Sequence, residues 1–166
     1  MSDILTQEEI DALLRGHAEL NEKQENTITS EEKDALGEIG NISMGTAATT
    51  LFTLLNHKVT ITTPEVEVTT LRDLGMQYPI PFVAVEIKYT EGLQGKNMLI
   101  IKEEDVKIIT DLMMGGDGSN TEGELTELHL SAIGEVMNQM IGSASTSLAT
   151  MFKKNINISP PTVTII

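Results

Sequence analysis

Two pairs of side chains in this sequence combine a carboxylate with a carboxamide at the same spacing. Glu38 precedes Asn41 by three residues, and Glu135 precedes Asn138 in the same way. On a helix, residues three apart share a face, so each pair would present an acid beside an amide. A carboxamide donates and accepts hydrogen bonds without titrating, which suits the positioning of a water molecule. Such stripes also occur on ordinary solvated helix faces, so spacing alone leaves both interpretations open.

The two pairs lie within a longer internal duplication. Residues 35–66 and 132–163 align without a gap, because matched positions are always separated by the same interval (138 − 41 = 97 and 161 − 64 = 97). Neighbouring positions differ, for example Ile42 against Gln139. A merely solvated face has little reason to keep an acid and an amide in both copies, so the duplication favours function. The period is too long for a typical solenoid and predicts a pseudo-symmetric single domain.

Two long helices are expected to carry the pairs. The first begins at Thr29 or Ser30 and runs to about Asn56, and the second begins between 121 and 126 and ends near Lys153. The other expected elements are strands at 58–68 (interrupted at Pro64), 81–89, 97–102, 155–158 and 163–166, and a helix at 103–114. The predicted fold class is α/β (α+β), a pseudo-twofold domain with two long repeat helices packed on a β-sheet. Repeat one would span about 30–114 and repeat two about 121–166. The second copy lacks the strands that follow the first, which favours a piece of a longer protein.

The N-terminus forms a separate unit in this interpretation. Residues 1–15 predict a short amphipathic helix, with Thr6 as N-cap and Glu9 completing a capping box. Residues 16–29 are polar and aperiodic, and predict a flexible linker. The helix could dock on its own domain or act as a detached recognition peptide, and the linker favours the peptide. The apolar side chains that would bind a partner are Ile4, Leu5, Ile10, Leu13 and Leu14.

Composition excludes several classes of function. A formal net charge of −14 argues against nucleic acid or an anionic membrane as partner. No apolar run approaches the ~20 residues that a membrane span needs. The absence of cysteine excludes disulfides and thiol nucleophiles. The three histidines, His17, His57 and His129, show no metal-ligand spacing, so no metal site is expected. The glycines form neither a phosphate-binding loop nor a dinucleotide fingerprint, and the GGDG stretch at 115–118 predicts a helix stop and a turn.

The spacing around both pairs resembles the signature of a known family. Asp34-x3-Glu38-x2-Asn41-x22-Pro64 and Ser131-x3-Glu135-x2-Asn138-x22-Pro161 both fit the [Asp/Ser]-x3-Glu-x2-Asn-x22-Pro pattern of the CheC/CheX/FliY phosphatases of bacterial chemotaxis. In addition, LTQEEIDALL resembles the N-terminal CheY-binding peptide of the flagellar switch proteins FliM and FliY. The combination is similar to the N-terminal and middle regions of FliY-type chains.

The resemblance implies a CheC-like fold and hydrolysis of the aspartyl-phosphate of the response regulator CheY. CheY would supply its own Mg2+ and a lysine, so this chain would need no cofactor of its own. Asn41 and Asn138 would position the attacking water, and Glu38 and Glu135 would pair with the regulator's lysine. The supporting residues would be Asp34 and Ser131, which cap or orient the glutamates, and Pro64 and Pro161, which shape strand ends.

The resemblance also implies partners and a location. Besides phosphorylated CheY, these would be other flagellar switch proteins (FliM, FliG and FliN-type). The location would be cytoplasmic, at the cytoplasmic face of the flagellar basal body if the rest of the switch-binding region is present. The alternative is a non-enzymatic switch or adaptor module that binds CheY through its N-terminal peptide and transmits the signal to the motor.

Overall fold

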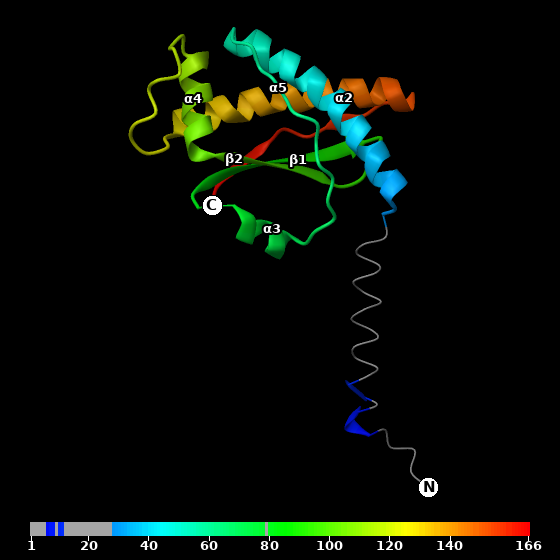
Figure 1. Cartoon of the computed structure of the whole chain (residues 1–166). Coiled ribbons are helices and arrows are strands. Elements are labelled where there is room, and N and C mark those ends of the chain that lie inside the picture. Colours follow the sequence, from blue (N-terminus) through cyan, green and yellow to red (C-terminus); the bar gives the residue numbers. More distant parts are fainter. Residues whose placement is uncertain (1–5, 9, 12–27, 79) are drawn as a thin grey trace.

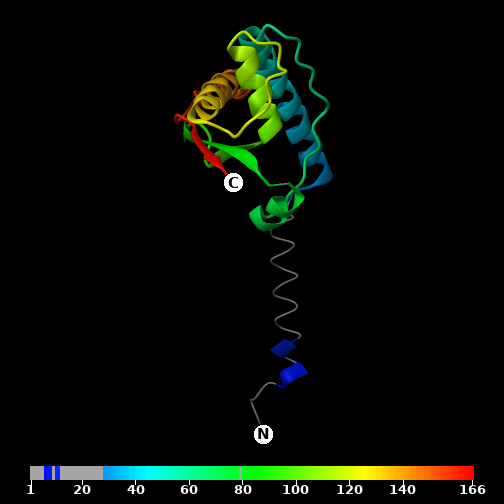
Figure 2. The ribbon, with the colours of Figure 1, turned by 90° about the vertical axis from the view of Figure 1, so that its left-hand side faces the viewer.

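Helices cover one face of an antiparallel sheet in the computed structural model, which describes residues 6–8, 10–11, 28–78 and 80–166. The two long helices, α2 (Ser30–Leu55) and α5 (Glu127–Phe152), cross each other above the strands (Figure 1). The shorter α4 (Glu103–Met113) lies beside them and completes the helical layer (Figure 2). This architecture confirms the predicted fold class.

The bounds of α2 and α5 reproduce the duplication. Both helices have 26 residues, and their first and last residues are offset by the interval of the sequence repeat (127 − 30 = 97 and 152 − 55 = 97). Each ends at a residue with positive φ, Asn56 at 54° and Lys153 at 53°. Each begins after a threonine: Thr29 accepts a hydrogen bond from the Glu32 N–H, and the Thr126 N–H donates to His129 Nδ1. The two helix predictions are therefore confirmed.

β1 (Phe82–Glu91) is the central strand of the sheet. It pairs along one edge with β2 (Lys96–Lys102) and along the other with β4 (Thr162–Ile165) and β3 (Asn157–Ile158), always antiparallel. Ser159 joins the last two strands to β1, because its N–H donates to the Lys88 carbonyl and its Oγ accepts from the Lys88 N–H. The strands predicted at 81–89, 97–102, 155–158 and 163–166 are confirmed, as is the helix at 103–114.

The core lies between the sheet and the helices. The β1 side chains Val83, Val85 and Ile87 are almost completely buried, as are Ile133 and Val136 of α5. These residues form one cluster with apolar residues of α2 and with Val106 of α4. Since α2 and α5 bury one face in this cluster, their other face is free to carry a site. None of the described helices is long and apolar enough to span a bilayer.

Residues 58–68 do not form the predicted strand, so that prediction is wrong. The segment has no regular structure, and Figure 2 shows it running along the outer side of α2 towards α3 (Leu71–Gln77). Among the described residues, no strand pairs with this segment. Its β-branched residues favour a strand only where a neighbouring strand lies beside them. The helix α3 was not predicted, although Thr70 caps it by accepting from the Asp73 N–H.

A buried hydroxyl on α5 yields a stability prediction. Ser145 is 3% exposed and its Oγ has no hydrogen-bond partner, whereas the matching position in α2 is Ala48 (145 − 97 = 48). An unsatisfied buried hydroxyl costs about 1–3 kcal/mol. Ser145→Ala is therefore expected to raise the free energy of unfolding by at least about 1 kcal/mol, measured by denaturant titration. The reverse substitution, Ala48→Ser, is the matched control and should lower it. A loss of stability in Ser145→Ala would contradict this account.

Candidate functional site

Both acid–amide pairs point away from the core. Glu38 and Glu135 are exposed, while Asn41 and Asn138 are partly buried. None of the four belongs to the buried cluster between helices and sheet. The α2 and α5 backbones therefore carry the two predicted pairs at equivalent positions, each in the N-terminal half of its helix.

Each pair borders a shallow depression that also contains the predicted proline. The first depression has a volume of about 520 Å³ and lies between α2 and residues 63–66; its lining includes Asp34, Glu38, Asn41 and Pro64. The second has about 500 Å³, and its lining includes Ser131, Glu135, Asn138 and Pro161. The structure thus brings together all four signature residues of each copy. Pro161 directly precedes β4, but Pro64 lies in irregular chain, so the prediction that Pro64 shapes a strand end is wrong.

Recurrent glycines explain how the proline segments come so close to the helices. A Cβ placed on Gly37 would lie 3.6 Å from the Val66 side chain, and one on Gly134 would lie 3.2 Å from Val163. The second distance is tighter than an ordinary contact, so a side chain there would require the Val163 side chain to shift by a few tenths of an ångström. The paired recurrence of these glycines and valines therefore reflects packing at the edge of each depression.

Comparison with known proteins places this geometry in a family. A family model described as the CheC-like family matches residues 31–68 and 128–165, which are the two copies of the duplication. The flagellar motor switch phosphatase FliY of Bacillus subtilis is 50% identical over 98% of this chain. The crystal structure of Thermotoga maritima FliY is 49% identical with a TM-score of 0.79, and the match covers 84% of this chain and 70% of that one. The chain belongs to the CheC-like family.

A second relative is more distant. The CheY-P phosphatase CheC of Bacillus subtilis is 27% identical over 84% of this chain and 69% of that protein. The present CheC-like chain covers only 44% of the length of the Bacillus subtilis FliY, so it spans less than half of that relative.

The two sites of this CheC-like domain are not identical. In the second site, Gln139 Nε2 donates a 2.8 Å hydrogen bond to Glu135 Oε1. The matching position in the first site is Ile42, which is 44% exposed and cannot make that bond. The first depression is also lined by Lys33 and Glu65, which increase the density of charge there. The difference between Ile42 and Gln139 is visible in the sequence, but the hydrogen bond to Glu135 that follows from it is visible only in the structure.

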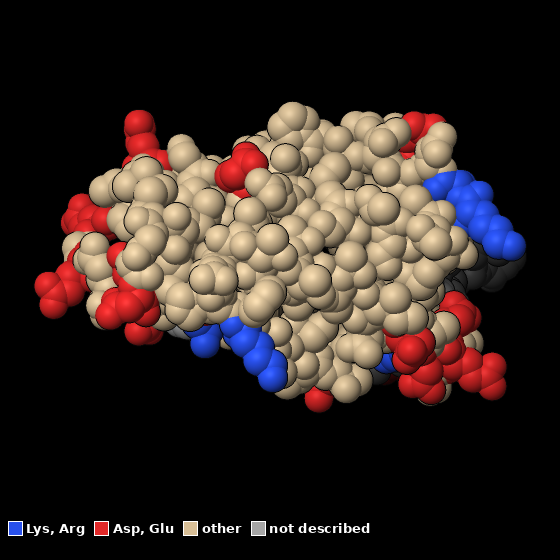
Figure 3. Space-filling model, turned by 90° about the horizontal axis from the view of Figure 1, so that it is seen from above, with Lys and Arg blue, Asp and Glu red and all other residues tan. Residues whose placement is uncertain are grey.

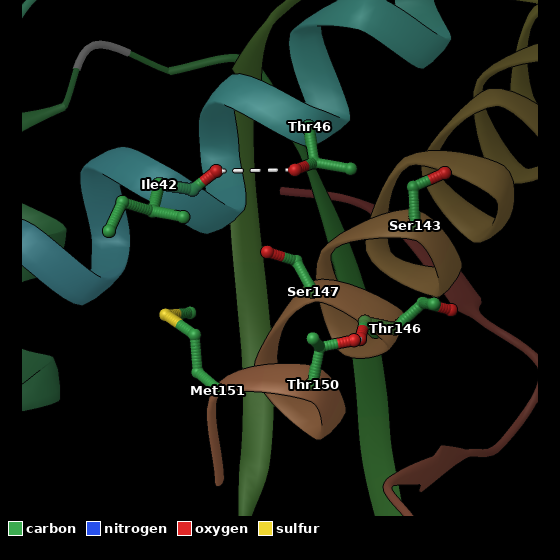
Figure 4. Close-up of a pocket in the computed structure, with 7 residues that line it drawn as sticks. All are labelled: Ile42, Thr46, Ser143, Thr146, Ser147, Thr150 and Met151. Carbon is green, nitrogen blue, oxygen red and sulfur yellow. Dashed lines mark hydrogen bonds between the residues drawn. The ribbon is translucent and has the colours of Figure 1, made fainter. Parts of the chain in front are cut away.

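Between the two CheC-like sites, the outer face of α2 and α5 is nearly free of charge. No Asp, Glu, Lys or Arg occurs from 39 to 55 or from 136 to 152, and Figure 3 shows the charged side chains mainly near the ends and edges of this face. A groove of about 490 Å³ crosses it, lined by Ile42, Thr46, Ser143, Thr146, Ser147, Thr150 and Met151 (Figure 4). The hydroxyls of Thr46, Ser143, Thr146 and Thr150 donate to carbonyls four residues earlier in their own helices. These four hydroxyl protons are therefore already used, and no charged side chain lines the groove.

The GGDG stretch forms the predicted helix stop and turn. Gly115 and Gly118 have φ values of 88° and 86°, and the Asp111 carboxylate accepts a hydrogen bond from the Gly118 N–H at 2.8 Å. Asp117 accepts from the N–H and hydroxyl of Ser119, and these bonds hold the pKa of Asp117 below its usual value. Amide N–H groups of this loop thus donate to carboxylates of the chain itself. Because a phosphate would need those same N–H groups, this arrangement argues against a phosphate site.

Among the residues that the structure describes, no three His, Asp or Glu side chains gather in a way that could hold a metal ion. At the N-terminus, Ile10 is exposed and belongs to a helical stretch. The other predicted peptide residues, Ile4, Leu5, Leu13 and Leu14, lie outside the described residues, as does most of the predicted linker.

Proposed function

We propose that this chain hydrolyses the aspartyl-phosphate of a CheY-type response regulator. The observation that carries the proposal is the twofold presentation of an outward Glu and Asn on helices with matching bounds, each beside its proline segment. Two relatives bear the names of phosphatases, flagellar motor switch phosphatase and CheY-P phosphatase, which supports the same reaction here.

The chemical groups in the two sites indicate which parts of the reaction this chain performs and which the receiver performs. Its sites hold no nucleophile with an adjacent base among the described residues, so the nucleophile is water. A phosphorylated receiver domain carries the electrophile, the Mg2+ and a lysine that neutralise charge in its own active site. Phosphoryl transfer depends mainly on positioning and charge stabilisation, and the step left to this chain is to place water in line with the scissile bond.

Each side chain then has one role. The carboxamide of Asn41 or Asn138 accepts a hydrogen bond from the water and donates one to a neighbouring oxygen, which fixes the water's orientation at any physiological pH. The carboxylate of Glu38 or Glu135 forms a charge-assisted bond with the receiver's lysine and sets the register of docking. The helix supplies the spacing, because residues three apart lie side by side.

Association with other flagellar switch proteins, at the cytoplasmic side of the motor, is the second part of the proposal. It is supported by the name of the Bacillus subtilis relative, which couples the motor switch to the phosphatase.

The test is phosphate release from purified CheY that has been phosphorylated with a small-molecule donor. Substoichiometric amounts of this chain should accelerate release above the spontaneous rate of CheY, with many turnovers for each chain. Binding without acceleration would instead support the adaptor function. Neither binding nor acceleration would remove both functions.

A further inference from the structure

A second pair of recurrent glycines lies one helical turn beyond the proposed water-positioning amides. Gly45 follows Asn41 by four residues, and Gly142 follows Asn138 by four residues, with the usual offset (142 − 45 = 97). Residues four apart share a helix face, so each glycine sits on the same stripe as its amide.

These glycines differ from Gly37 and Gly134, which pack against valines. A Cβ placed on Gly45 or Gly142 would meet nothing within 4 Å. Glycine in the middle of a helix lowers stability by about 0.5–1 kcal/mol relative to alanine. The described residues contain no packing contact that offsets this cost, yet both copies of the duplication retain the glycine.

The open space beside each glycine affects how far the neighbouring asparagine can reach into a partner. Asparagine is short, and the side chains of a helix extend well beyond its ~2.3 Å backbone radius. For the carboxamide of Asn41 to reach a phosphoryl group inside another protein's active site, the adjacent position on its stripe must not hold the partner away. A glycine there removes the obstruction, and the matching arrangement recurs at Asn138.

We propose that Gly45 and Gly142 are positioning residues that let the phosphorylated receiver close directly onto the helix backbone beside Asn41 and Asn138. The inference rests on the proposed phosphatase function and adds the surface on which the substrate closes. Its occupant is a segment of the receiver bordering the phosphorylation site, contacting through backbone or apolar atoms, since no charged residue of α2 or α5 follows Glu38 or Glu135 before the helix ends.

The experiment isolates one site and adds a methyl group. In a chain carrying Asn138→Ala, so that only the first site works, Gly45→Ala is expected to lower kcat/KM for phosphorylated CheY by about 10- to 100-fold, because small misplacements at a reacting centre have effects of this size. The same substitution should raise the thermal midpoint by about 2–4 °C through helix propensity. The dissociation constant for CheY bearing beryllofluoride, a stable acyl-phosphate mimic, should rise as well. Gly142→Ala in an Asn41→Ala chain should behave alike at the second site.

A merely structural role predicts a different pattern, because activity and stability would then fall together. The matched control is Thr53→Ala, which improves helix propensity at an exposed position of α2 eight residues beyond Gly45 and outside the lining of the first depression, and should leave kcat/KM unchanged. A lower thermal midpoint in Gly45→Ala would overturn the inference, and so would full activity with unchanged affinity for CheY. In either case the proposed phosphatase function would remain. If the single-site parent neither binds nor dephosphorylates CheY, the proposed function and this inference fail together.

Discussion

Replacing both carboxamides, Asn41→Ala together with Asn138→Ala, is expected to abolish the stimulated release of phosphate from phosphorylated CheY. The receiver keeps its Mg2+ and lysine in this experiment, so its spontaneous hydrolysis should persist. What disappears is the oriented water, and loss of such positioning lowers a rate by about 10²-fold or more. Release should therefore return to the rate of CheY alone.

The double variant is informative because its fold should be intact. Both asparagines lie outside the buried cluster, so removing their amides creates no core cavity. Circular dichroism and the thermal midpoint should match those of the parent, and the affinity for beryllofluoride-activated CheY should stay close to the parent value. The repeat-matched control, Thr53→Ala with Thr150→Ala, changes exposed side chains on the same helices and should retain activity. Phosphate release by the Asn double variant at the parent rate would refute the assignment.

The single variants measure how the two sites share the work. If both sites are active, Asn41→Ala should retain only the rate of the second site, and Asn138→Ala only the rate of the first. The sites differ by the Gln139–Glu135 hydrogen bond and by the extra charges around Glu38, so the two residual rates need not be equal.

The duplication allowed much of the helical layer to be predicted from sequence. An ungapped repeat implies two copies of the same local structure, and Asn56 and Lys153 indeed end their helices with the same left-handed backbone. The strands at 81–89 and 97–102 were predicted as well, although β1 buries four consecutive residues, 82–85, rather than alternate ones. Local patterns sufficed where an element's own residues determine its conformation.

Strand formation in the first copy shows where sequence patterns fail. Residues 65–68 and 162–165 occupy the same repeat position (162 − 65 = 97), but only the second set forms a strand. β4 lies against β1, whereas no described strand lies against 65–68. β-propensity is a preference for fitting beside neighbours, so the same pattern gives a strand or irregular chain according to what lies alongside.

The grouping of the signature residues was predicted more completely than the fold around them. The signature named four residues in each copy, and the structure gathers all of them at one depression per helix. What the signature could not give is their surroundings: the bond from Gln139 and the open space in front of Gly45 depend on side-chain placement and on absent neighbours. These are tertiary facts, which a one-dimensional pattern does not contain.

Deleting residues 1–15 is expected to raise KM for phosphorylated CheY by about 10²-fold and to leave kcat unchanged. The predicted linker of residues 16–29 has 14 residues and a flexible-chain span of about 20 Å. A regulator held by the peptide would therefore experience the catalytic face at an effective concentration of up to about a millimolar, and such tethering commonly gains 10²- to 10⁴-fold in apparent affinity. Since the peptide contributes no group to the reaction, the rate at saturating CheY should not change.

Linker length separates tethering from an allosteric effect of the peptide. Doubling the linker should lower the effective concentration about threefold, following the −3/2 power of length, and raise KM accordingly. Free peptide of residues 1–15 added to the truncated chain should not restore the low KM, because it no longer brings CheY to the site. Ile10→Ala in the full chain should reproduce part of the deletion, since Ile10 is an exposed apolar residue of this helix. An unchanged KM after deletion would show that the peptide does not recruit CheY, and a lower kcat would place it at the reaction itself.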